Sequence, residues 1–214
     1  MNARWLATLS LAVFASDSVG KSLRWEEAFR TSSAPENVYF EARYQEDGLF
    51  HRIKVWRQGE AQVRRETDGR MDLYAYRQPD GETQYRILDL SQRRSISITR
   101  ENLHRIGIFR DWWSLGRVLA KPWGEFAIFA QEKSRVVAKG GSCLWYELYP
   151  LGTRICWSEA WGLPLLIRDA GASDAISFEI ISVRRFSPKA EPLRLPDKDF
   201  VSIDANVDID PSED

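Results

Sequence analysis

The residue types that most often carry out catalysis are scarce in this chain and do not form a recognisable catalytic pattern. Its 214 residues include only two histidines, His51 and His104, and neither accompanies a G-x-S-x-G nucleophile motif. Nucleophilic catalysis needs a Ser or Cys together with a positioned base and a group that orients this base. We therefore expect no catalytic residue, no cofactor and no enzymatic activity, and we interpret both histidines as structural.

A second pattern of possible ligand residues lies near the C-terminus. Asp204, Asn206, Asp208 and Asp210 alternate like positions one, three, five and seven of a calcium-binding loop. That loop also needs Gly at position six, where this chain has Ile209, and Glu at position twelve, which falls beyond residue 214. The pattern therefore predicts no metal site, and we expect a solvated acidic end instead.

The two cysteines of the chain, Cys143 and Cys156, flank a segment with turn residues at its centre. In residues 149–152 (YPLG), Pro presets φ and Gly tolerates a positive φ, which favours a hairpin. The absence of a CxxC motif and of neighbouring histidines argues against redox catalysis and zinc binding. We predict a structural disulfide that stabilises the fold by roughly 3 kcal/mol.

The N-terminus has the features of a secretory signal peptide, which we place at residues 1–20. Arg4 supplies a positive charge, residues 5–14 form a short apolar run, and cleavage is expected after Ala15 or Gly20. The run is too short to cross a bilayer, which takes ~20 residues, and no other stretch approaches that length. The alternative is a buried N-terminal helix of a cytosolic protein. We expect a soluble periplasmic protein without a transmembrane segment in its mature form, in a compartment where disulfides persist.

The overall charge is distributed unevenly along the chain. Residues 197–214 contain seven acids and one base, a charge of −6, which leaves +5 for residues 1–196 out of a net −1. This distribution is typical of a solvated tail, and the alternatives are docking of the tail on the body or weak attraction of anionic partners. The arginines at 64, 65, 93 and 94 form no long basic patch, so we expect no nucleic-acid partner.

The pattern of apolar and turn residues predicts an antiparallel β sheet or barrel in a single domain, residues 21–214, with an acidic C-terminal tail. A short helix is expected over 22–32, and a second helical segment, 99–120, is broken at Gly107, with Asp111 as the N-cap of its second piece. Turn signals every 8–12 residues separate the expected strands. These strands cover residues 37–45, 49–57, 61–67, 70–77, 83–90, 94–98, 126–131, 135–138, 163–168 and 175–184, together with the cysteine hairpin.

The order of the expected elements over nearly all of the mature chain resembles a known family, and the last third carries the most specific part of this resemblance. Residues 156–165 (CWSEAWGLPL), a return strand over 176–184 and a closing LPDKDF at 195–200 are similar to the periplasmic lipoprotein carrier superfamily (LolA/LolB-like), which also includes the N-terminal domain of RseB-type stress sensors. The resemblance implies an α+β fold: a strongly curved antiparallel sheet, or incomplete β-barrel, with helices covering its concave face. The cysteine pair and the Trp-rich segment 99–120 depart from the family pattern.

Such a fold implies an apolar cavity between the sheet and the helical segment 99–120, which would act as a lid. The residues that we expect to line this cavity are Phe109, Trp112, Trp113, Leu115 and Leu119 of that segment, with Phe40, Ile53 and Val55 of the sheet. The alternative for Trp112 and Trp113 is that they are ordinary core. We predict a non-enzymatic protein that holds an acyl chain, lipid or lipoprotein segment, at about 0.8 kcal/mol per buried methylene. The alternative is a regulatory module that binds a periplasmic protein along its sheet edge or lid.

Overall fold

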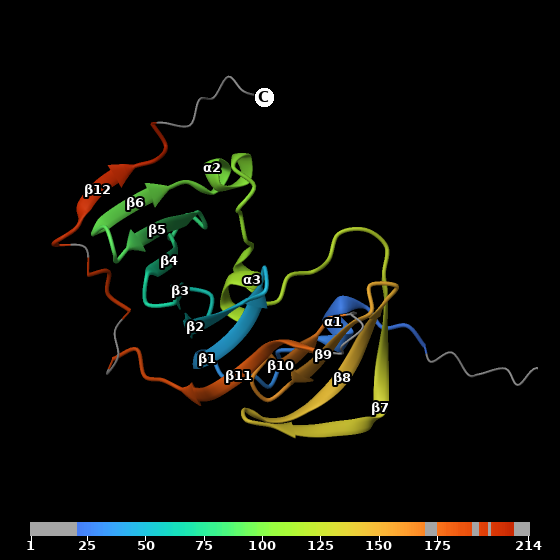
Figure 1. Cartoon of the computed structure of the whole chain (residues 1–214). Helices are drawn as coiled ribbons and strands as arrows, with labels where there is room; N and C mark the ends of the chain where they lie inside the picture. The colour runs from blue at the N-terminus through green and yellow to red at the C-terminus, as the bar shows by residue number, and fades with distance from the viewer. Residues whose placement is uncertain (1–20, 170–174, 190–192, 197, 208–214) are drawn as a thin grey trace, which may run out of the picture.

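The computed structural model describes residues 21–169, 175–189, 193–196 and 198–207, with the backbone alone for residues 132–136. The predicted signal peptide and residues 208–214 lie outside this range. The described residues form one curved, open sheet of twelve strands with three short helices, so the fold is mostly sheet (Figure 1). None of the described helices has the length and apolar character required to cross a membrane.

The first part of the sheet consists of the first six strands of the chain together with the last described strand, β12. The order across this part is β12-β6-β5-β4-β3-β2-β1. The bounds are β1 (Asn37–Glu46), β2 (Leu49–Gln58), β3 (Gln62–Thr67), β4 (Met71–Arg77), β5 (Thr83–Asp89), β6 (Arg94–Ile98) and β12 (Val201–Asp204).

The other five strands continue the sheet beyond β1, in the order β11-β10-β9-β8-β7. Their bounds are β7 (Ala127–Ala138), β8 (Gly141–Tyr149), β9 (Thr153–Ser158), β10 (Leu163–Arg168) and β11 (Ile176–Arg185). Because β1 pairs with both β2 and β11, it joins the two parts of the sheet.

Local turn chemistry explains why consecutive strands pair as hairpins. Asp47 and Gly48 both have positive φ, 50° and 79°, in the two-residue turn between β1 and β2. Positive φ at both central positions gives a turn whose twist matches that of the flanking strands, and Asp-Gly favours it. Asp68 and Gly69 repeat the pattern between β3 and β4, with φ of 53° and 65°. The predicted strands of this region therefore agree with the structure to within one or two residues.

Alternation along the strands gives β1–β6 two different faces. Phe40, Ile53 and Val55 lie on one face and are completely buried in the larger apolar cluster of the protein. Helices α2 (Arg100–Arg105) and α3 (Trp112–Arg117) pack on this face, which we call the helix face. The opposite side, which we call the polar face, carries Tyr39, Lys54 and other polar side chains.

The two helices in segment 99–120 begin at side-chain caps. The Thr99 side chain accepts a hydrogen bond from the Asn102 N–H, and the Asp111 side chain accepts one of 2.6 Å from the Ser114 N–H. Side-chain acceptors satisfy amides that otherwise lack a partner at a helix start. Gly107, with φ of 72°, separates the two helices. The predicted break at Gly107 and the predicted N-cap at Asp111 are therefore confirmed.

Several expectations from the sequence are wrong in detail. The helix expected over 22–32 is only the four-residue α1 (Trp25–Ala28), and the two strands expected at 126–138 are one strand, β7. The sheet is not wholly antiparallel, because β12 pairs with β6 in parallel. Part of the segment expected to be a solvated acidic end is therefore a strand. Helices of four to six residues are short beside this sheet, and covering of its concave face stays a prediction.

A disulfide joins Cys143 to Cys156, as predicted, with their Cα atoms 5.3 Å apart on β8 and β9. Both cysteines are buried, with exposed fractions of 3% or less. Beside this hairpin lies the second apolar cluster, where α1 packs with Trp157 of β9 and Ile128 of β7. The disulfide therefore braces the half of the sheet that is farthest from β12 (Figure 1).

Candidate functional site

A pocket of about 260 Å³ lies between segment 99–120 and the helix face, the region where the family resemblance implied a cavity. Across the sheet, the row Arg65–Leu73–Ile87 passes over β3, β4 and β5 in register and forms the floor. Leu103 of α2 and Leu115 of α3 stand on either side, and we call this site the α2–α3 pocket. Its full lining is Arg65, Thr67, Met71, Leu73, Tyr85, Ile87, Leu103, Ile108, Arg110 and Leu115.

Large apolar side chains remain exposed at the mouth of the α2–α3 pocket. Ile108 is 54% exposed and Met71 is 40% exposed, although both belong to the lining. Ile106, just outside the lining, is 46% exposed. Exposed apolar side chains that adjoin a concavity mark a binding site more often than scattered ones do. The α2–α3 pocket is therefore accessible to an apolar group from solvent.

Two cations accompany this apolar lining. Burial lowers the pKa of Arg65, the Tyr44 hydroxyl opposes this shift, and the nearby charge of Arg110 adds to it. Arg110 itself is exposed at the edge of the pocket. An anionic group between these two guanidinium groups would relieve their mutual repulsion. The pocket can thus accommodate an apolar chain together with one negative charge.

Helix α3 rests on a buried guanidinium group. Arg57 is 3% exposed, and the closest atom to a Cβ built on Gly116 of α3 is the Arg57 Cδ, at 3.0 Å. Its Nη2 donates long hydrogen bonds of 3.5 Å to the carbonyl oxygens of Pro35 and Trp161, while Nη1 has no partner. Burial and the charge of Arg117 lower the pKa of Arg57 to about 10. Attachment of α3 therefore includes a costly buried charge.

The residues expected to line the cavity occupy two separate clusters. Phe40, Ile53 and Val55 are completely buried in the larger cluster with Leu115, and Phe109 and Trp112 pack against it. Trp113 and Leu119 instead belong to the second cluster, where Trp113 stacks on Trp157 with ring centroids 5.9 Å apart. Of the eight, Leu115 lines the α2–α3 pocket. Whether the others contact a ligand stays a prediction.

Sequence reasoning did not find the residues of β3, β4 and β5 that form the floor of the pocket. Leu73 follows Asp72 and Ile87 follows Arg86, so alternation indicated that Leu73 and Ile87 each lie on an apolar side of their strand. Which strands lie beneath α2 and α3 depends on the pairing register, which alternation within one strand does not reveal. The sequence therefore indicated the apolar side of each strand, but not which strands would lie together beneath α2 and α3.

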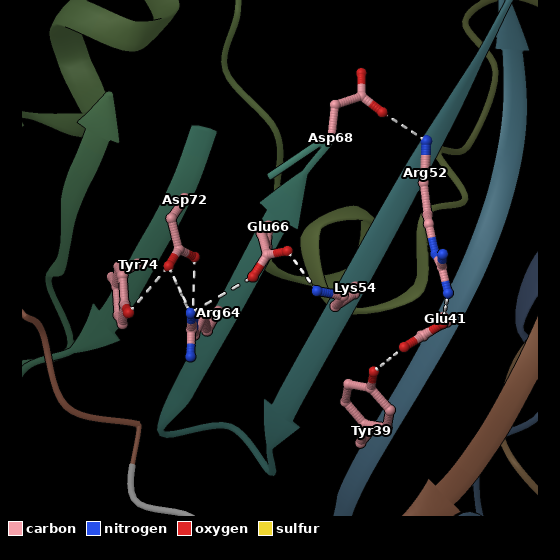
Figure 2. Close-up of polar contacts among 9 residues, drawn as sticks. All are labelled: Tyr39, Glu41, Arg52, Lys54, Arg64, Glu66, Asp68, Asp72 and Tyr74. Carbon is pink, nitrogen blue, oxygen red and sulfur yellow. Dashed lines mark hydrogen bonds and ion pairs between the residues drawn. The ribbon is translucent and has the colours of Figure 1, made fainter. Parts of the chain in front are cut away.

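The polar face carries ion pairs between neighbouring strands (Figure 2). Lys54 Nζ lies 2.6 Å from a carboxylate oxygen of Glu66, and Arg64 Nη2 lies 2.8 Å from one of Asp72. Hydrogen bonds lower the pKa of Glu41, first from the Tyr39 hydroxyl and then from Arg52. General acids usually have raised carboxyl pKa values, so this network resembles cross-strand bracing more than an acid–base site.

The structure also gives the contacts of both histidines and of part of the acidic pattern near the C-terminus. His51 Nδ1 lies 2.7 Å from Asp68 Oδ2 beside the β3–β4 turn, and the His104 ring stacks on Phe109 at 3.8 Å. Asn206 Oδ1 accepts a hydrogen bond of 2.8 Å from the Thr99 N–H, so this residue ties the chain end to α2. Within the described residues, no three His, Cys, Asp or Glu side chains gather as metal ligands would, and Asp208 and Asp210 lie outside them.

Comparison with solved structures finds a similarity to one described as "Crystal structure of MucB". The two chains share 11% sequence identity with a TM-score of 0.43, over 83% of this chain and 64% of the MucB chain. This chain thus spans less than two thirds of the MucB chain. No protein-family model and no curated protein matches the sequence. Membership in the lipoprotein carrier superfamily remains a proposal.

Proposed function

We propose that this protein is a periplasmic, non-enzymatic binding protein that holds an acyl chain with an anionic end in the α2–α3 pocket. The observation that carries the proposal is the pocket itself, an apolar concavity between segment 99–120 and the sheet, with Arg65 and Arg110 in its lining. An acyl carboxylate matches both features, since its chain is apolar and its head is negative. Ion pairing with a half-buried Arg65 would be screened less by water than pairing on an open surface.

The size of the pocket supports an acyl chain and not a larger ligand. Its 260 Å³ exceeds the ~150 Å³ of a cavity that admits benzene. It is smaller than the ~300–1,000 Å³ of pockets that enclose drug-sized molecules. Each methylene transferred from water into an apolar pocket contributes about 0.8 kcal/mol. A short chain therefore gains useful affinity without specific polar contacts along its length.

The periplasmic location rests on two observations that point the same way. The disulfide Cys143–Cys156 is a bond that persists in oxidising compartments. Residues 1–20 have the charge and apolar run of an export signal. Detection of the mature N-terminus by mass spectrometry of protein recovered from a periplasmic extract tests this part of the proposal. A chain that retains residues 1–20 in the cytoplasm would contradict it.

Two matched substitutions at the mouth of the pocket test the proposed ligand site. Ile108 and Ile106 are both about half exposed, but only Ile108 belongs to the lining. We expect Ile108→Asp to abolish decanoate binding in isothermal titration calorimetry, because it places a negative charge beside the apolar chain. Ile106→Asp should bind decanoate like the wild type. Equal affinity in both variants, or no binding by the wild type, would contradict the proposal.

An open sheet edge favours the second candidate function, a module that binds another protein. Apart from one bridge between Leu23 and Ile128, the outer edge of β7 pairs with no strand in the described part of the chain. An unpaired edge can accept an extended peptide as an added strand. Hydrogen exchange separates the two candidates: a bound peptide would protect amides along β7, whereas a bound acyl chain would protect those of α2 and α3.

A further inference from the structure

A second, larger pocket of about 780 Å³ lies beside the end of the chain, outside the proposed acyl site. Leu195 and Asn206, which flank β12, contribute to its lining, and we call it the C-terminal pocket. The described residues between β11 and β12 (186–189, 193–196 and 198–200) pass alongside the first part of the sheet (Figure 1). Because β12 pairs with β6, Leu195 and Asn206 are held beside the sheet, where they form part of the wall of this pocket.

Hydrogen bonds fix this part of the chain on both sides of the pocket. Gln62 Nε2 donates a hydrogen bond of 2.6 Å to the Leu193 carbonyl oxygen. Beyond β12, the Ala205 N–H donates one of 3.0 Å to the Ser97 carbonyl oxygen. Leu193 is also buried, at 7% exposed. The segment that carries Leu195 and Asn206 is thus held to the sheet by hydrogen bonds on both sides of the C-terminal pocket.

Side chains that form hydrogen bonds dominate the sheet side of the C-terminal pocket. Gln62, Tyr76 and Gln84 are register partners on the polar face of β3, β4 and β5. Arg86 and Ser97 are also partners, and alternation along β5 places Arg86 on the same face as Gln84. Tyr76 is half-buried, and its ring stacks on that of Tyr74 with centroids 6.2 Å apart. Amides, a hydroxyl and an aromatic ring are groups that bind the hydroxyls and the apolar face of a sugar.

The charge of the lining favours an anion. Three arginines and one acid, Glu82, belong to it. Two of the arginines already have partners. Arg77 Nη2 lies 3.5 Å from Glu60 Oε2, and the Arg77 guanidinium group lies over the Trp112 ring. The Arg100 guanidinium group lies over the Phe109 ring. Arg86 forms no ion pair with an acid of the described residues, and it is half-buried. Its guanidinium fork is suited to a carboxylate or a phosphate.

We propose that the C-terminal pocket binds a sugar-sized, hydroxyl-rich ligand that carries one anionic group, with Arg86 as the anchor for that group. The volume lies within the ~300–1,000 Å³ typical of small-molecule pockets. Tyr76 supplies a ring for stacking, and Gln62, Gln84 and Ser97 supply partners for hydroxyl groups. This site shares Tyr85 with the lining of the acyl site, but its proposed anchor, Arg86, and its amide side chains lie on the polar face of the sheet.

The test is titration of the full chain with four probes: glucose 6-phosphate, glucuronate, glucose and inorganic phosphate. We expect one or both anionic sugars to bind more tightly than glucose and inorganic phosphate. The pair also distinguishes a phosphate from a carboxylate as the preferred anion. Backbone amide signals of Gln84, Arg86 and Ser97 should shift in heteronuclear NMR spectra as binding saturates.

Substitutions locate the binding in the C-terminal pocket. Arg86→Ala should weaken anionic-sugar binding about tenfold or more, since hydrogen bonds to charged groups contribute strongly. Gln84→Glu, at an exposed position that leaves the fold intact, should weaken it through repulsion. Arg70→Ala, in the exposed β3–β4 turn, is the matched control. Decanoate binding should stay unchanged in all three variants, so the two proposals fail separately.

Three results would overturn the proposal. The first is no binding of either anionic sugar at millimolar concentration. The second is binding that Arg86→Ala and Gln84→Glu leave unchanged. The third is an affinity for inorganic phosphate equal to that for both anionic sugars, since the pocket would then recognise an anion without a sugar.

Discussion

The length of chain that fits the α2–α3 pocket is a quantitative consequence of its volume. A small group takes up about 30 Å³ in a condensed phase, as water does, so 260 Å³ holds about eight or nine methylene-sized groups. Each methylene contributes about 0.8 kcal/mol, which is about a fourfold change in the dissociation constant. For a series of straight-chain carboxylates we expect affinity to rise about fourfold per carbon and then to level off at about nine carbons.

Substitution of Leu73 by Trp moves this limit. Leu73 lies in the middle of the row Arg65–Leu73–Ile87 on the floor of the pocket, so a larger side chain there occupies space that the ligand would use. We expect the affinity of Leu73→Trp for carboxylates to level off at a shorter chain length than in the wild type, with unchanged affinity for chains that still fit. The matched control is Ile96→Trp, because Ile96 is the register partner of Ile87 on the same face but lies outside the lining.

Isothermal titration calorimetry with carboxylates of six to twelve carbons, below their micelle concentrations, measures both quantities. Circular dichroism and thermal melting establish that each variant is folded. The reasoning is refuted if wild-type affinity is independent of chain length or rises without a limit. It is also refuted if the limiting chain length of Leu73→Trp equals that of the wild type and of the control Ile96→Trp.

Two further predictions concern stability. Replacing both cysteines by Ser should lower the free energy of unfolding by roughly 3 kcal/mol, from the 13-residue separation of Cys143 and Cys156, and a urea titration that shows no loss would contradict the entropic account. Arg57→Met should raise the free energy of unfolding at pH 7 by about 1–3 kcal/mol, because it removes a buried cation whose pKa is lowered to about 10. A variant less stable than the wild type would contradict this expectation. Between about pH 10 and 12.5 the unfolded wild type binds more protons at Arg57 than the folded one, so wild-type stability should gain a contribution as pH rises there, and this gain should be absent from Arg57→Met.

Local signals account for the part of the fold that could be predicted. The Asp47-Gly48 and Asp68-Gly69 turns require positive φ, which few residue pairs adopt easily, so the hairpins could be located from the sequence. The same holds for Asp111, whose carboxylate caps the helix that begins at the next residue. Such features depend on residues only a few positions apart.

The candidate site depends on longer-range contacts and was only partly predicted. The family resemblance implied a cavity beneath segment 99–120, and of the eight residues expected to line it only Leu115 belongs to the pocket found there. Yet Trp112 and Trp113, neighbours in the sequence, contact different apolar clusters, since adjacent residues of a helix point in different directions. Their apolar character gave no information about which cluster each would join.

The sequence by itself determined the strands and turns of β1–β6, the Asp111 cap and the disulfide, because alternation, turn residues and one cysteine pair act over short separations. Only the tertiary structure decided which strands lie beneath α2 and α3, and it placed Arg57 under α3 without an ion pair to any acid of the described residues. It also turned 201–204 into a strand on β6, in a segment whose acidic composition had suggested a solvated end. Pairing between distant segments is set by packing and register across the whole sheet, and local composition does not encode it.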